Sequence, residues 1–169
     1  MLVMAVAAIL DRDLRALARE VAAYPDEEAL WRTPAGIANS AGTLVLHLTG
    51  NIEHFMGAKL GGSDFVRDRA REFSDRDVPR TALLGRIEAA RAAVRAAAER
   101  TGDERQDADY PEAVGGVRVA LADLLIHLVS HLGYHLGQVD YHRRVVTGSA
   151  RSVDAIRAAE LATARPVAD

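Results

Sequence analysis

Apolar residues recur at every third or fourth position over residues 2–23, with charged residues between them. The stripe consists of Val6, Leu10, Leu14, Leu17 and Val21. This spacing puts the apolar side chains on one helical face and predicts an amphipathic helix. Pro25 ends it, because the residue before a proline is pushed out of the α region. A packed connector with Pro34 and Gly36 is expected over residues 26–38.

Three further long helices are expected, over about residues 40–60, 79–100 and 121–146. Asn39 or Ser40 can cap the first, since both side chains satisfy free backbone amides at a helix start. The second is expected to begin with Asp77 as a capping carboxylate, followed by Pro79, which needs no amide hydrogen bond. Gly148 follows the third and is a frequent helix terminator.

Shorter helical stretches are expected at residues 65–73 and 152–164, and residues 101–116 are expected to form a loop. The chain offers no convincing strand alternation. We therefore expect an all-α fold, with the long helices packed as a four-helix bundle. Its length suits one domain over residues 1–169, with a tail that frays from about residue 165.

Composition and charge narrow the function classes. The chain has 169 residues, a net charge of -3 and no cysteine. Acidic and basic residues are interspersed and form no concentrated basic surface, so nucleic-acid binding is not expected. The apolar start, Met1–Val6, is far shorter than the roughly 20 residues of a membrane span and lacks the basic start of a secretory signal. We expect a cytoplasmic protein in which any metal site is built from His, Asp or Glu.

Histidines are concentrated in the last long helix, which contains His127, His131, His135 and His142. Side chains four residues apart lie one turn above another, so two imidazoles at this spacing can bind one metal ion. His127 and His135 are about 12 Å apart along the axis at 1.5 Å per residue, too far to share an ion with His131 between them. The spacing leaves two pairs open, His127 with His131 and His131 with His135.

A further ligand must come from another helix, and His47 is the best candidate. It lies in the apolar segment Leu44–Leu48, where an unpaired imidazole would cost about 1–3 kcal/mol. Asn51 and His54 follow on the same helical face, and we expect them to lie near the site or its substrate. Lone histidines such as His54 and His142 are more often surface or hydrogen-bonded residues than ligands.

Other charged residues give weaker indications of a functional site. The charged run Arg67–Glu72 is expected to be a solvated face or a network of weak salt bridges. Glu53 and Asp140 are the candidate general bases, although helix phase places Asp140 off the face of His131 and His135. The absence of an evident base mildly favours activation of a thiol, which brings its own nucleophile.

Two motifs resemble the DinB/YfiT-like superfamily of small bacterial metalloproteins. The segment Asn39–Leu48 resembles a helix motif that ends near the first metal ligand, and the segment His131–Gln138 resembles a His-x-x-x-His-x-Gly-Gln motif. Arg67-Asp68-Arg69 with Glu72-Phe73 resembles the intervening segment of one branch. The likeness covers roughly residues 1–147.

The resemblance implies a four-helix bundle with an up-down-down-up connection, often forming a homodimer. It also implies one divalent ion per chain, usually nickel, zinc or iron, held by three histidines. Carried over to this sequence, the metal ligands are His47, His131 and His135, and His127 belongs to the surroundings.

The resemblance does not imply one activity, although some relatives are thiol-dependent S-transferases or isomerases. Three histidines leave coordination positions open, which is typical of a catalytic site. We expect a metal-dependent enzyme, a thiol S-transferase or a hydrolase, that acts on a low-molecular-weight thiol or another small molecule. Asn51, Tyr134 and Gln138 are candidates to orient ligands or substrate. The alternative is a non-catalytic metal-binding or stress-related interaction protein that acts as a homodimer.

Overall fold

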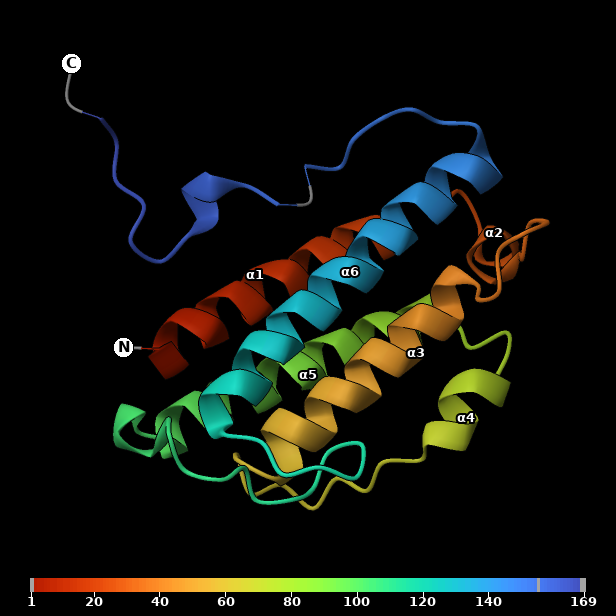
Figure 1. The fold of residues 1–169 in the computed structure, drawn as a ribbon. Coiled ribbons are helices and arrows are strands. Elements are labelled where there is room, and N and C mark those ends of the chain that lie inside the picture. Colours follow the sequence, from red (N-terminus) through yellow and green to blue (C-terminus); the bar gives the residue numbers. More distant parts are fainter. Residues whose placement is uncertain (1, 155, 168–169) are drawn as a thin grey trace.

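The computed structural model describes residues 2–154 and 156–167, and its regular elements are all helical (Figure 1). The long helices are α1 (Leu2–Ala22), α3 (Ala41–Ile52), α5 (Arg80–Arg100) and α6 (Leu121–Thr147). The shorter ones are α2 (Glu27–Trp31), α4 (Arg69–Ser74), the π-helix η1 (Glu53–Ala58), and the 3-10 turns η2 (Asp103–Arg105) and η3 (Ala158–Glu160). The all-α prediction is confirmed for the described residues.

The four long helices enclose one hydrophobic core. α1 contacts α5 and α6, and α3 contacts the same two helices. Leu10 of α1, Leu48 of α3, Ile87 of α5 and Leu132 of α6 are fully buried in that core. Each helix therefore buries its apolar stripe against two neighbours, as the helical spacing of these residues predicts.

α3 is the most enclosed helix, because every residue from Ala41 to Ile52 is buried. Its N-cap is Ser40, whose Oγ accepts a hydrogen bond from the Thr43 amide at 3.1 Å. Besides α5 and α6, it contacts α2 and α4. A Cβ at Gly42 would lie 2.6 Å from the Trp31 ring, so the glycine is what lets α2 pack this closely.

Several helix boundaries in the structure differ from those that the sequence predicted. The helix expected to about residue 60 keeps α geometry only to Ile52 and continues as the π-helix η1. Asp77 does not cap α5: its φ is 56°, Pro79 occupies the N-cap position, and Glu27 accepts the hydrogen bond of the Arg80 amide at 2.8 Å. α4 lies within the charged segment where a short helix was expected.

The helix expected at residues 152–164 is replaced by the single 3-10 turn η3. Asp154 has a φ of 54°, which interrupts a right-handed helix, and its amide donates to Ser152 Oγ. Part of the tail that was predicted to fray from about residue 165, residues 168–169, lies outside the described residues. Within the described part of the chain, no helix has the length and apolar character of a membrane span.

Candidate metal centre

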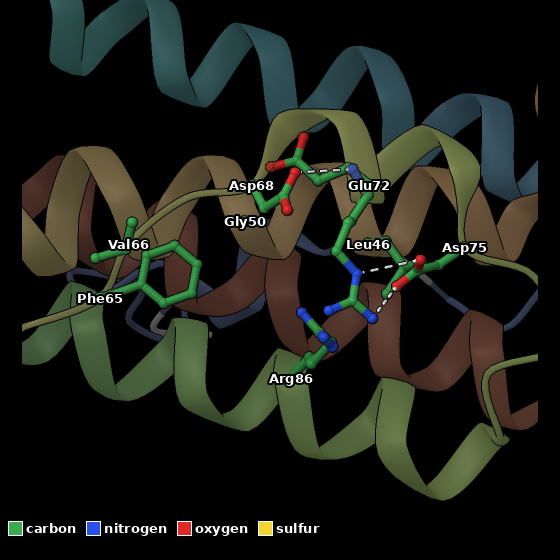
Figure 2. Close-up of a pocket in the computed structure, with 9 residues that line it drawn as sticks. Leu46, Gly50, Phe65, Val66, Asp68, Glu72, Asp75 and Arg86 are labelled. Atoms are coloured by element: carbon green, nitrogen blue, oxygen red, sulfur yellow. Dashed lines mark hydrogen bonds and ion pairs between the residues drawn. The ribbon is translucent and has the colours of Figure 1, made fainter.

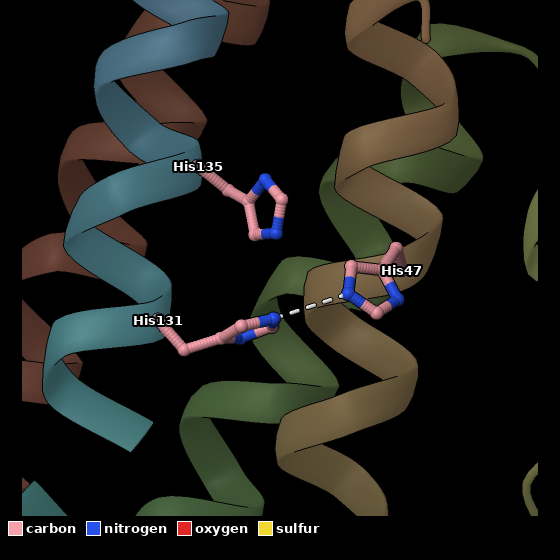
Figure 3. A group of neighbouring side chains, drawn as sticks. All are labelled: His47, His131 and His135. Atoms are coloured by element: carbon pink, nitrogen blue, oxygen red, sulfur yellow. Dashed lines mark hydrogen bonds between the residues drawn. The ribbon is translucent and has the colours of Figure 1, made fainter. Parts of the chain in front are cut away.

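Three histidines from two helices converge between α3 and α6, as Figure 3 shows. They are His47 of α3, and His131 and His135 of α6. Each offers one ring nitrogen, and these three nitrogens all lie within 4.8 Å of one another. The Nε2 atoms of His47 and His131 are 3.2 Å apart. Two nitrogens bound to one ion at about 2.0–2.1 Å would be separated by about 3.0–3.4 Å, so this spacing suits a shared ion.

The outer nitrogen of His47 is hydrogen-bonded to Glu72 of α4. The His47 Nδ1 to Glu72 Oε2 distance is 3.0 Å, and both side chains are buried. A carboxylate only accepts hydrogen bonds, so His47 donates from Nδ1 and keeps its lone pair on Nε2. Arg67 donates to both oxygens of Glu72, at 2.6 Å from Nε and 2.8 Å from Nη2. An ionised carboxylate that is paired with Arg67 thus fixes the tautomer of His47.

His135 has a comparable partner on its own helix. Its Nδ1 lies 2.7 Å from Gln138 Oε1, and an amide oxygen is an acceptor. His135 therefore also donates from Nδ1 and carries its lone pair on Nε2. Gln138, a candidate for orienting a ligand, contacts a histidine of the cluster in this way.

Burial keeps His131 and His135 neutral. The pKa of His131 is lowered to about 4, mainly by desolvation and additionally by the nearby His135, His47 and His127. Desolvation also lowers the pKa of His135, partly offset by its bond to Gln138. Neutral imidazole is the form that binds metal ions, so these two rings are prepared for coordination near neutral pH.

Glu72 remains ionised despite its burial. Desolvation alone would raise its pKa, but the hydrogen bonds from Arg67 and His47 hold the pKa of Glu72 below its ordinary value. The negative charge beside His47 therefore persists at neutral pH. A carboxylate that accepts from a histidine raises the basicity of the opposite ring nitrogen toward a metal.

The other candidates near the cluster differ in their exposure. Asn51, one turn after His47, is buried, and its Oδ1 has no hydrogen-bond partner among the described residues. His127 is exposed, with its ring stacked 5.9 Å from that of His131. Tyr134 is 67% exposed and its ring lies 5.1 Å from that of His135. Each is close in sequence and space to a histidine of the cluster.

His54 does not lie with these residues, contrary to the expectation from its helical face. The π-helix changes the phase of the chain after Ile52, and His54 Nε2 lies 2.5 Å from Glu112 Oε1 in the loop before α6. Lys59 holds the other oxygen of Glu112 at 2.7 Å. His54 is therefore part of a separate polar group.

The remaining titratable candidates are also engaged elsewhere. Asp140 pairs with Arg143 and Arg144, each at 2.9 Å. Glu53 lines a hollow against the alanines of α5, and desolvation raises its pKa. His142 is a buried hydrogen-bonded residue: its Nδ1 is 2.8 Å from Tyr24 Oη and its Nε2 is 2.7 Å from the Arg32 carbonyl. None of these contacts involves the three clustered histidines.

Sequence reasoning missed the roles of Arg67 and Glu72. Of the two alternatives for this charged run, the salt bridge is found between Arg67 and Glu72, but Glu72 is only 6% exposed and is not part of a solvated face. Its burial arises because α4 folds back onto α3, where it also borders a polar hollow of about 190 Å³. Figure 2 shows Gly50 and Glu72 among the residues that line this hollow. The charge pattern held no sign of a fold-back that brings a carboxylate to His47.

Comparison with known families agrees with this architecture. The sequence model of the DinB superfamily matches residues 9–139, a stretch that contains all three clustered histidines. Neither the curated proteins nor the solved structures gave a match. Because the matched region covers most of the chain, this protein belongs to the DinB superfamily.

Proposed function

We propose that this DinB protein binds one divalent metal ion through His47, His131 and His135. The observation that carries the proposal is the convergence of three ring nitrogens within 4.8 Å. Two of the rings have their outer nitrogens occupied by Glu72 and Gln138, which directs Nε2 of each toward the others. An all-imidazole donor set suits nickel, zinc or iron(II).

We propose further that the site is catalytic. A bound ion supplies Lewis acidity, which lowers the pKa of a water or thiol in one of the positions that three histidines leave open. Glu72 is held by Arg67 and His47, and Asp140 and Glu53 face other parts of the molecule. The scarcity of a free carboxylate favours a thiol S-transferase over a hydrolase that needs a separate general base.

The enzymatic proposal is tested with metal-replete protein and a panel of model electrophiles. Each electrophile is offered with bacillithiol, mycothiol, glutathione or no thiol. Thiol-dependent turnover that is lost in His131→Ala supports the S-transferase, and turnover without thiol supports the hydrolase. A protein that binds metal but turns over none of these substrates supports the alternative, a non-catalytic metal-binding or stress-related interaction protein.

We also propose the up-down-down-up connection of the superfamily and a homodimer formed along α6. The ribbons of α1 and α6 run in one direction in Figure 1, and those of α3 and α5 in the other. Four large apolar side chains of α6 are more than half exposed: Ile126, Tyr134, Tyr141 and Val145. Exposed apolar surface of this kind often marks an interface. Sedimentation analysis of Tyr141→Asp should then show monomers where the unaltered chain dimerises.

A further inference from the structure

The segment between α3 and α5 reaches the histidine cluster through Glu72. This carboxylate makes three hydrogen bonds, one with His47 and two with Arg67. Asp68 begins the short helix that presents it, because its Oδ1 accepts from the Arg71 amide at 3.0 Å. The position of Glu72 therefore depends on how closely α4 can approach α3.

Gly50 sets that approach. A Cβ at Gly50 would lie 2.3 Å from Glu72 Oε1 and 3.0 Å from Glu72 Cδ, closer than the carboxylate can tolerate. Alanine is the better residue for a helix interior, so α3 alone gives no reason for glycine at this position. The carboxylate that contacts His47 occupies the space that a side chain at residue 50 would fill.

We propose that Gly50 and Glu72 are positioning residues for the metal site. Gly50 admits the Glu72 carboxylate to the surface of α3, and Glu72 fixes the Nδ1–H tautomer and ring orientation of His47. Gly50 thus acts only through Glu72, and Glu72 acts through His47. The expected effect on metal affinity rests on the proposed metal site. The expected effect on the His47 tautomer rests on the hydrogen bonds alone.

The hollow beside Glu72 makes substitution of Gly50 informative. An added methyl group would meet the end of a flexible side chain, and a hollow of about 190 Å³ adjoins it. Glu72 can therefore move aside without breaking the helices apart. Gly50→Ala should leave the bundle folded while it removes the carboxylate from His47, which separates a positioning effect from a loss of structure.

The experiment is a double-mutant cycle on the full chain, with Gly50→Ala, Glu72→Ala and the double variant. Zinc affinity is measured by competition with a chromophoric chelator. Each single variant should bind zinc about 10- to 100-fold more weakly, as is usual when the partner of a ligating histidine is lost. In the Glu72→Ala background, Gly50→Ala should change the affinity less than about threefold, since its effect passes through Glu72. Equal weakening in both backgrounds would overturn the coupling.

Two controls accompany the cycle. Gly85→Ala alters a helical glycine of α5 whose Cβ would meet no heavy atom of the described chain within 4 Å, and it should leave zinc affinity unchanged. Glu72→Gln keeps an oxygen that can accept from His47 Nδ1, so it should weaken binding less than Glu72→Ala. Glu72→Gln that binds as poorly as Glu72→Ala would mean that charge, and not the position of His47, is what matters.

A readout that needs no metal distinguishes this inference from the proposed function. Nitrogen-15 NMR of metal-free protein should show His47 protonated on Nδ1, and a mixture of tautomers in Gly50→Ala and Glu72→Ala. If the unaltered chain binds no zinc yet shows this change, the proposed metal site fails and the positioning inference stands. If His47 has the same tautomer in all of these proteins, the positioning inference is wrong.

Discussion

The Nε2 atoms of His47 and His131 face each other at 3.2 Å across the space between α3 and α6. Because Glu72 accepts the Nδ1 proton of His47, the Nε2 of His47 is an acceptor. Without metal, neutral His131 must therefore donate from Nε2. A metal ion requires lone pairs on both atoms, so the proton of His131 has to leave Nε2 when an ion binds.

This relationship predicts an exchange of tautomers at His131. Adding zinc should move the His131 proton from Nε2 to Nδ1, while His47 stays protonated on Nδ1. The measurement is a long-range nitrogen–proton correlation spectrum before and after addition of zinc, with His142 as an internal reference outside the cluster. An unchanged His131 spectrum in zinc-loaded protein would contradict coordination through Nε2.

The metal-free protein should lose stability in mild acid. The unfolded chain binds protons at histidine below about pH 6.5, whereas folded His131 resists protonation until about pH 4. Unfolding therefore takes up protons in this window, and the free energy of unfolding falls as the pH falls. We expect His131 to account for about 1 kcal/mol of the loss between pH 7.5 and 5, allowing for its partial exposure.

Chemical denaturation of chelator-treated protein at the two pH values measures this loss. His131→Gln should lose less stability than the unaltered chain, because it has no proton to take up at this position. His127→Gln, altered at an exposed histidine one turn away, keeps His131 and should lose more stability than His131→Gln. Equal losses in all three proteins would contradict the lowered pKa of His131.

Two glycines in helices should respond oppositely to alanine. A Cβ at Gly42 would lie 2.6 Å from the Trp31 ring, so Gly42→Ala must displace α2 and should destabilise the fold by about 1–3 kcal/mol. Gly85→Ala meets open space on α5 and should stabilise it by about 0.5–1 kcal/mol. Thermal unfolding of both variants checks this, and a stabilised Gly42→Ala would be inconsistent with the packing of Trp31 on α3.

The ion pair between Glu20 and Arg143 should matter far more than a surface pair. Arg143 Nε lies 2.6 Å from Glu20 Oε2, and their side chains are 3% and 1% exposed. Removing the carboxylate leaves the buried guanidinium with Asp140 as its remaining acidic partner among the described residues, so Glu20→Ala should cost about 2–3 kcal/mol. Glu88→Ala, at a partner of Arg91 that is 59% exposed, should cost less than about 1 kcal/mol. If urea denaturation gave similar losses of stability for Glu20→Ala and Glu88→Ala, the greater importance of the buried pair would be contradicted.

The sequence predicted the helices well because apolar periodicity reports which face of each helix is buried. It placed Asn39 or Ser40 at a helix start, and Ser40 is the N-cap. Spacing left two histidine pairs open, and the resemblance to the DinB family chose His131 with His135. The sequence could not show that η1 has π geometry, which sends His54 to Glu112. Nor could it show that α4 folds back so that Glu72 contacts His47. Such a contact depends on tertiary packing and on the absence of a side chain at Gly50.

Metal content after purification without added metal tests the central claim most directly. The unaltered chain, His131→Ala and His127→Ala are analysed by mass spectrometry of metals and by titration of the metal-free proteins with zinc. We predict one tightly bound ion per chain in the unaltered protein and in His127→Ala, and none in His131→Ala. Equal metal content and affinity in His131→Ala and the unaltered chain would contradict a site built from His47, His131 and His135.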